Sequence, residues 1–405
     1  MRLLLVADTY PPARISGALQ MRDLAHALAV LGHRPLVLVP TASHDAQPGL
    51  AEEYDVQVLR VRAPRTKDVG LIRRTAAELV LPWVLLRGLH RSPLRGECWD
   101  GIVWYSPTIF LGPLVRTLKR RHGCRTYLIL RDLFPDWAVD AGVMRKGLIY
   151  RWFKVIERFQ YRQADTIGVQ TPSNSPLVSR DAPPAARMEV LHNWLAPTPL
   201  PAEADQLPSL SKLQGRTIFV YAGNMGIAQD MDAFVALARR MRSRDDVGFL
   251  FVGRGSESVR LKELVNDEGF ENLLVIKEID PMLLPALLAH CHVGIVALHP
   301  GHRTHNIPGK LLTYLRAGLP VLARVNPDND LVNLVPEEDI GCVVPGNDPD
   351  LLERQATRLA DDPVLRKRMG HAGIALAQRM FSPASAAEQI AASFAISRVR
   401  MYHQR

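Results

Sequence analysis

The chain alternates short apolar runs with longer amphipathic stretches, and it does so twice. In the first half the runs are "RLLLVA", "RPLVLVP", "VQVLRV", "GIVWYS", "TYLILR", "TIGVQ" and "MEVLHN". In the second half they are "TIFVYAG", "VGFLFVG", "LLVIK", "VGIVAL", "PVLAR" and "GCVV". Apolar strands that alternate with helices predict parallel sheets covered on both faces. The chain is therefore predicted to be α/β, with two Rossmann-like, doubly wound domains.

A break separates the two halves. The stretch "LAPTPLPAEADQLPSLSKLQG" is rich in Pro, Ala and Ser and has no periodic pattern, so we interpret residues 196–215 as a linker. This predicts an N-terminal domain of residues 1–195 and a C-terminal domain of residues 216–380, a division that suits 405 residues. Such sheets bind ligands at the carboxyl ends of their strands, so the two halves are expected to face a central cleft.

Composition and charge restrict both the location and the partners of the protein. No apolar run approaches the length of about 20 residues that a membrane span needs, and "MRLLLVADTY" is too short for a signal peptide, so a cytoplasmic location is expected. The formal charge of +9 favours anionic partners such as phosphorylated ligands or acidic lipids. The chain shows neither a nucleic-acid module nor aromatic base platforms, so nucleic acid is not an expected partner.

Two loops of the second half carry small residues between a strand and a helix. "FVYAGNMGIAQDMDAF" contains Gly223, Asn224 and Gly226, and "FLFVGRGSES" contains Gly253 and Arg254. Glycine lets the backbone approach a ligand, and a helix N-terminus favours an anion. The alternative is that these glycines serve the turns alone, and neither loop has the full dinucleotide-binding fingerprint.

The stretch "LHPGHRTHNIPGKLLTYLRAGLPV" combines three histidines with the start of a helix. His299, His302 and His305 are spaced by three, but the Pro-Gly pair after His299 breaks any helix, so the rings need not converge on a metal. Pro308 suits the first turn of a helix. The free amides beyond it, together with Lys310, are expected to bind a phosphate.

Two acidic triplets, Asp230-Met-Asp232 and Asp328-Asn-Asp330, resemble the DxD of metal-dependent sugar transferases. In this context we favour helix-capping acids over metal ligands. No metal and no cofactor are predicted for the chain.

In the first half, "LRDLFPDWAVDAG" follows a strand, which places Arg131, Asp132 and Asp136 at the carboxyl edge of the predicted sheet. Carboxylates there can orient hydroxyl groups or a proton. Alternatively, Asp136 caps a helix that begins near Trp137. Gly17 lies in the loop after the first strand, just before a helix.

Two stretches of the first half, 70–95 and 144–162, mix basic residues with aliphatic and aromatic side chains. Basic amphipathic helices with aromatic residues are typical of the surface of an anionic membrane. The alternative is that they are helices that cover the domain and expose a basic face to water.

The order and spacing of several motifs resemble GT-B glycosyltransferases of family 4, which are retaining nucleotide-sugar enzymes. The resemblance spans nearly the whole chain. The motifs that carry it are "DTYPPARISGALQMRDLAHALAVLGH", "ADTIGVQTPSNS", "VLHNW", "YAGNMGIAQDMDAF", "FLFVGRGSES" and "GKLLTYLRAGLPVLA". Within the family, "RDLFPD", "GNMGIAQ" and "NIPGKLLTYLRAG" are most similar to bacterial surface-polysaccharide transferases, including those of O-antigen (N-acetylfucosamine) and colanic acid assembly.

The resemblance implies an activity. It implies transfer of a sugar, a hexosamine or deoxyhexosamine, from a nucleoside diphosphate donor, UDP-linked, to a saccharide on a polyprenyl diphosphate lipid. It also implies that the enzyme is peripheral on the inner face of the cytoplasmic membrane and needs no metal. In this fold the last helix, 381–405 here, crosses back to the N-terminal domain.

The resemblance also implies site residues. Gly17 would face the donor diphosphate, and the segment from Ile276 to Met282 would border the nucleobase. The implied catalytic residues are Asp132, Asp136, His305 and Lys310. The implied donor-binding residues are Gly17, Asn224, Gly226, Arg254, Lys277, Met282, Arg303, Ile307, Pro308, Gly309 and Thr313.

The chain departs from the family at one point. Where the family often has two glutamates separated by seven residues, this chain has His305 and Thr313. Two other hypotheses stay open: a GT-B nucleotide-sugar epimerase or hydrolase, and a non-catalytic binding protein with a degenerate donor site, which would explain the missing glutamates.

Overall fold

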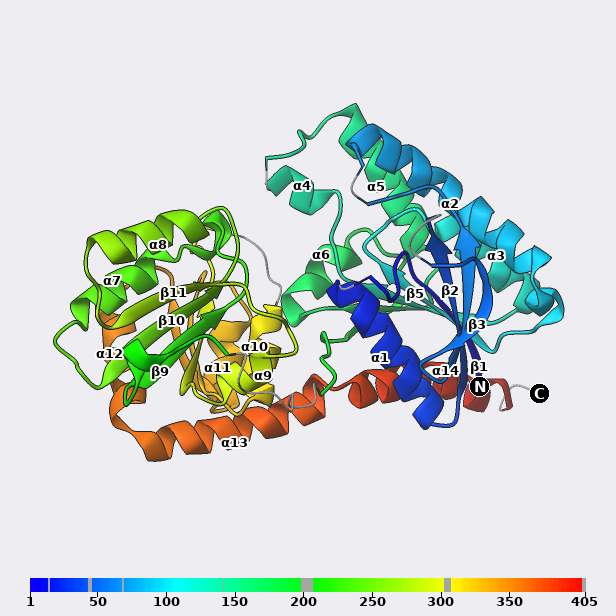
Figure 1. The fold of residues 1–405 in the computed structure, drawn as a ribbon. Coiled ribbons are helices and arrows are strands. Elements are labelled where there is room, and N and C mark those ends of the chain that lie inside the picture. Colours follow the sequence, from blue (N-terminus) through cyan, green and yellow to red (C-terminus); the bar gives the residue numbers. More distant parts are fainter. Residues whose placement is uncertain are drawn as a thin grey trace. The chain divides into compact units, whose positions relative to one another are not determined.

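The computed structural model describes residues 1–402 apart from residues 14, 43–45, 68, 141, 198–206 and 302–306, with side chains described up to residue 395. The chain forms two compact units. Unit 1 comprises Met1–Ala196 together with Ser382–Arg405, and unit 2 comprises Pro197–Phe381 (Figure 1). The two-domain α/β fold expected from the alternation is confirmed.

Unit 1 contains an eight-stranded sheet of order β3-β4-β2-β1-β5-β6-β7-β8. All neighbours are parallel except the β3–β4 pair, which is antiparallel. The edge strand β3 was not predicted, because its sequence "GLAEE" is mostly exposed and has no apolar run. The strands are β1 (Arg2–Val6), β2 (Arg34–Thr41), β3 (Gly49–Glu53), β4 (Val56–Arg62), β5 (Gly101–Ser106), β6 (Arg125–Leu130), β7 (Thr166–Val169) and β8 (Arg187–Val190).

Helices cover both faces of this sheet. In β1, Leu3 and Leu5 pack on one face against α1 (Ser16–Val30) and α14 (Pro383–Tyr402). The alternate residues of β1 face the core that contains α2 and α3, as the two-residue period of a strand requires. The remaining helices are α2 (Leu71–Arg91), α3 (Gly112–His122), α4 (Asp136–Asp140), α5 (Leu148–Tyr161) and α6 (Ser175–Ser179).

Unit 2 contains a fully parallel six-stranded sheet of order β11-β10-β9-β12-β13-β14. Helices α7, α8 and α12 pack on one face, and α10 and α13 pack against each other. The strands are β9 (Thr217–Ala222), β10 (Val247–Gly253), β11 (Leu273–Lys277), β12 (Val293–Ala297), β13 (Val321–Val325) and β14 (Gly341–Pro345). The helices are α7 (Asp232–Arg240), α8 (Ser258–Asp267), α9 (Leu284–Leu288), α10 (Gly309–Arg316), α11 (Leu331–Glu337), α12 (Pro349–Asp361) and α13 (Pro363–Met380).

Each sheet has one topological switch point. In unit 1 the chain leaves β1 toward β2 and later returns to the other side of β1 as β5. In unit 2 it leaves β9 toward β10 and returns as β12. In open α/β sheets, ligands bind outside the carboxyl ends of the strands at such points. The loops after β1 and β5, and after β9 and β12, are therefore where a site is expected.

The loops after β9 and β10 are in direct backbone contact. The Gly223 N–H donates a hydrogen bond to the Val252 carbonyl at 2.8 Å. Gly253 has a φ of +154°, and a Cβ atom there would lie 1.8 Å from the Gly223 carbonyl oxygen. Only glycine fits at this position, for steric reasons and for conformational ones.

We predict that Gly253→Ala lowers the free energy of unfolding by roughly 3 kcal/mol or more, because a methyl group would push the two loops apart. Urea denaturation of the full chain measures this loss. Gly123→Ala is the control, because Gly123 also has a positive φ (+60°) but no atom lies within 4 Å of its Cβ position. The control should lose only about 1 kcal/mol, and equal losses in both variants would contradict the steric argument.

Candidate functional site

The switch point of unit 2 brings Lys310 onto the loop after β9. The Lys310 Nζ lies 4.8 Å from the centre of the Tyr221 ring. A Cβ atom on Gly223 would lie 2.6 Å from the Lys310 Cε atom. The missing side chain of Gly223 therefore makes the space through which Lys310 passes, and the Tyr221 ring supports its ammonium group through a cation–π contact.

Lys310 is a half-buried cation at the beginning of a helix. It is the second residue of α10, whose N-cap is Pro308. Burial lowers its pKa to about 8. No carboxylate forms an ion pair with it among the residues that the structure describes. A desolvated ammonium group and the positive end of a helix both favour an anion.

The rest of the loop after β9 is held by the chain itself. The Gln229 Oε1 atom accepts hydrogen bonds from the Gly226 N–H at 3.0 Å and from the Asn224 side chain at 3.2 Å. The Met225 N–H donates to the Arg254 carbonyl at 2.7 Å. The Gly226 amide is therefore engaged within the loop, whereas the Asn224 side chain is exposed.

Four other donor-binding residues expected from the sequence lie at or after the ends of β10 and β11 or on α10. Arg254 and Lys277 follow or end β10 and β11, both are exposed, and Arg254 lies 3.5 Å from Glu278. Met282 is exposed in the turn before α9. Thr313 donates its hydroxyl hydrogen to the Gly309 carbonyl inside α10, at 3.4 Å.

The remaining predicted positions, in the segment 302–309, divide into residues that the structure describes and residues that it does not. Ile307 is buried, and Gly309 begins α10. Arg303, His302 and His305 lie outside the described residues, so their predicted roles are not addressed by the structure.

The first acidic triplet forms ion pairs. The Asp230 carboxylate lies 2.8 Å from the guanidinium of Arg324, which is 3% exposed. Asp232 lies 2.9 Å from Arg260. The interpretation of Asp230 as a helix cap is wrong, because its carboxylate neutralises a buried arginine instead.

On the loop after β6, one strand beyond the switch point of unit 1, the side chains of Arg131 and Asp132 differ in burial. Arg131 is buried, donates to the Leu191 carbonyl at 2.7 Å and lies over the Trp194 ring at 5.1 Å. Asp132 is exposed on the loop after β6. Partial desolvation by the surrounding protein raises the pKa of Asp132, and the nearby charge of Asp8 raises it further. Arg131 thus anchors the loop that presents Asp132.

Gly17 has a packing role in unit 1. A Cβ atom there would lie 3.1 Å from the Tyr105 ring, so glycine allows α1 to approach β5. The Tyr105 hydroxyl donates to Gln20 at 3.3 Å on the same helix.

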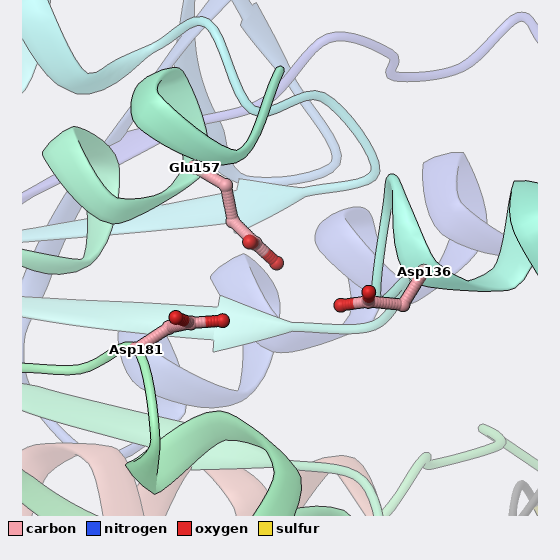
Figure 2. A group of neighbouring side chains, drawn as sticks. All are labelled: Asp136, Glu157 and Asp181. Atoms are coloured by element: carbon pink, nitrogen blue, oxygen red, sulfur yellow. The ribbon is translucent and has the colours of Figure 1, made fainter. Parts of the chain in front are cut away.

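Asp136 belongs to a cluster of three carboxylates with Glu157 and Asp181 (Figure 2). The Lys154 Nζ forms ion pairs with all three, at 2.9 Å from Asp136 and 2.5 Å from Asp181. Tyr150 also donates to Asp136 at 2.7 Å. The lysine ammonium supplies the charge that a metal ion would otherwise bring. Asp136, the first residue of α4, therefore ties this short helix to α5 and to the loop after α6.

We predict that Lys154→Met lowers the free energy of unfolding by about 3–5 kcal/mol, because three carboxylates lose their common counter-charge. Burial raises the pKa of Glu157 to about 7. The loss should shrink as the pH falls below that value, because Glu157 then takes up a proton and the repulsion weakens.

Urea denaturation of the full chain at several pH values tests this prediction. Arg260→Met removes an exposed pair with Asp232 and should cost less than about 1 kcal/mol. A loss as small in Lys154→Met as in this control would contradict a stabilising role of the cluster.

Sequence reasoning missed Asp8, Tyr221 and Lys154. Asp8 follows β1 as Asp132 follows β6, so the position of each residue after its strand was a usable signal. For Tyr221 no such signal exists, because it lies within a strand and its partner Lys310 is distant in sequence. Lys154 lies three residues before Glu157 on α5, a spacing that pairs opposite charges on a helix, but its other partners Asp136 and Asp181 are distant in sequence.

Apolar side chains are exposed on three helices of unit 1 and at Val143, between α4 and α5. Phe110 lies 6.2 Å from Trp152 on α5, and Phe134 lies 6.1 Å from Trp137 on α4. Thr108, near Phe110, donates to Glu78 on α2 at 2.8 Å, which places α2 beside them. We call these side chains the apolar surface: Leu71, Ile72, Val80, Trp83, Trp137, Val143, Leu148, Ile149, Trp152 and Val155.

Basic residues accompany this surface. They are Arg73, Arg74, Arg145, Lys146 and Arg151.

Among the described helices, none has the length and the apolar content that crossing a bilayer would need.

The sequence matches two families of domains. Residues 17–194 match the "Glycosyl transferase 4-like domain", and residues 216–362 match "Glycosyl transferases group 1". One relative is the "Probable glycosyltransferase WbjE" of Pseudomonas aeruginosa, 23% identical over 78% of this chain and 79% of its own. Another is the "Putative colanic acid biosynthesis glycosyl transferase WcaI" of Escherichia coli K12, 26% identical over 54% of this chain and 56% of its own.

Solved structures share the fold. Sucrose-phosphate synthase from Thermosynechococcus elongatus superposes with a TM-score of 0.69 at 16% identity, covering 100% of this chain and 98% of that one. HepE of Anabaena, solved in complex with UDP and glucose, gives a TM-score of 0.63 at 14% identity and covers 98% of this chain and 99% of that one. The two sheets with their switch points and the two matched domains together show that this chain belongs to the glycosyltransferases of the GT-B fold.

Proposed function

We propose that this glycosyltransferase moves a sugar, a hexosamine or deoxyhexosamine, from a UDP-linked donor to a saccharide on a polyprenyl diphosphate lipid, in the synthesis of a bacterial surface polysaccharide. The observation that carries the donor side is the half-buried ammonium of Lys310, unpaired with any described carboxylate, at the start of α10 and at the switch point of unit 2. The UDP bound to HepE and the name of WcaI support the choice of nucleotide and pathway.

The chemistry proposed for Lys310 is stabilisation of the leaving group. As the bond between the sugar C1 atom and the donor phosphate breaks, negative charge grows on the phosphate oxygen. A bond then forms between C1 and an acceptor hydroxyl, whose proton passes to the departing phosphate, and retention requires attack from the face that the phosphate leaves. Lys310 and the amino end of α10 are fixed before the reaction, which is what makes electrostatic stabilisation effective.

The test is nucleotide release from a panel of UDP-, GDP- and ADP-sugars, with and without EDTA and a polyprenyl diphosphate-linked saccharide. We expect release that depends on donor and acceptor, survives EDTA and falls about 100-fold in Lys310→Ala. Release that EDTA abolishes would contradict metal-free transfer. If no donor gives release and no nucleotide binds, the non-catalytic hypothesis replaces this one, and turnover of the donor without acceptor favours an epimerase or hydrolase.

Nucleotide affinity should depend on pH through Lys310. Its pKa of about 8 means that the free protein loses this charge above that pH, while a bound diphosphate stabilises the ammonium. We therefore predict that UDP binding weakens by up to about tenfold per pH unit above 8, measured by titration calorimetry. Lys310→Arg should remove this dependence, since arginine stays charged above pH 12, and a dependence that persists in it would exclude Lys310 as its source.

We also propose that the apolar surface of α2, α4 and α5 rests on an anionic membrane. Leu148 and Ile149 are 83% and 67% exposed at the beginning of α5, next to Arg145 and Lys146. Burial of exposed apolar side chains in lipid, together with attraction of neighbouring basic side chains to acidic headgroups, strengthens binding to a membrane. This location would bring the enzyme to a lipid-linked acceptor.

We predict that Leu148→Ser with Ile149→Ser weakens binding to vesicles containing phosphatidylglycerol by at least about tenfold, because two exposed apolar side chains no longer enter the lipid. Co-sedimentation with these vesicles measures the effect. Val364→Ser, at a 77% exposed position of unit 2, is the control and should bind like the unchanged chain. Equal binding by all three proteins would argue against this surface.

A further inference from the structure

Asp8 is a buried carboxylate at the switch point of unit 1 that no step above uses. It follows β1, one of the two strands between which the chain reverses its direction of winding. Its side chain is 10% exposed, and its Oδ2 atom lies 3.4 Å from the Lys67 Nζ. Its Oδ1 atom is buried and has no hydrogen-bond donor among the described residues. A carboxylate oxygen buried in this way costs free energy until a donor reaches it.

Asp132 is the second carboxylate at this place. It follows β6, and β5 is the one strand between β1 and β6. Neighbouring strands lie about 4.8 Å apart, so the two loops are separated by about 10 Å, a width that spans one sugar ring. Both residues follow parallel strands at the same carboxyl edge of the sheet, which places the two carboxylates near one region, and the exposure of Asp132 makes this region accessible.

The surrounding charges indicate what can bind here. Burial raises the pKa of both carboxyl groups, and the positive charges nearby act against this rise. In their ionised form the carboxylates only accept hydrogen bonds, so the ligand must donate them. Lys67 and Arg74 act on this pair as positive neighbours, which disfavours a divalent cation as the ligand. A neutral ligand that carries several hydroxyl groups fits both conditions.

We propose that Asp8 and Asp132 bind hydroxyl groups of the acceptor saccharide on unit 1, with Asp8 holding the more deeply placed hydroxyl. The proposal rests on the proposed function, since it deepens the acceptor side of the same transfer. It makes Asp8 a specificity-determining residue, and it requires no part of the donor site in unit 2.

The experiment separates acceptor binding from nucleotide binding. The full chain and its variants are applied to an array of bacterial surface saccharides, and UDP affinity is measured by calorimetry. Asp8→Asn should weaken saccharide binding by about tenfold or more, the value of a lost hydrogen bond to a charged group, and leave UDP affinity unchanged. Lys310→Ala should do the reverse, so failure of the donor site and failure of this proposal are distinguishable.

Two further variants guard against a structural explanation. Lys67→Met breaks the ion pair of Asp8 and should keep saccharide binding within about threefold, because Lys67 lies next to the Oδ2 atom and not next to the unbonded Oδ1 atom. Asp132→Asn, at an exposed position, should fold and lose binding even if Asp8→Asn does not fold. The proposal is overturned if the unchanged chain binds no saccharide, if both aspartate variants bind as well as it does, or if Lys67→Met loses as much.

Discussion

The close approach of two backbone loops in unit 2 is the constraint on which its candidate site depends. Gly253 allows the loop after β10 to contact the Gly223 carbonyl, and Gly223 in turn leaves the space that Lys310 occupies. A side chain at either glycine would move the lysine away from the Tyr221 ring. The ammonium position is therefore set by missing side chains as much as by the atoms around it, which gives the charge a fixed place before any ligand arrives.

The two switch points differ in charge. In unit 2, the loop after β12 supplies a lysine that pairs with no described carboxylate, so the edge of the sheet favours an anion. In unit 1, the loops after β1 and β6 supply two carboxylates, of which Asp8 retains an unbonded oxygen. A glycosyl transfer needs a partner for the diphosphate and a partner for sugar hydroxyls. The same doubly wound topology can provide both because only the residues after the strands change.

The parallel strands and the start of α10 were predictable from the sequence because they depend on local patterns. Apolar runs identified every parallel strand, and Pro308 with Lys310 identified the start of α10. The edge strand β3 was missed because an edge strand need not bury its side chains. Tyr221 under Lys310 and the ring of carboxylates around Lys154 were also missed, because tertiary packing joins residues that are far apart in the chain.

The acidic motifs show why composition alone misleads about metal sites. The Asp230 triplet and the cluster of Asp136, Glu157 and Asp181 both have the residue types of a cation site. In each, a basic side chain, Arg324 or Lys154, already balances the charge. Asp8 differs because its basic neighbour reaches only one of its oxygens. The proposal for Asp8 thus depends on a hydrogen bond that the chain leaves unmade, and no sequence motif records it.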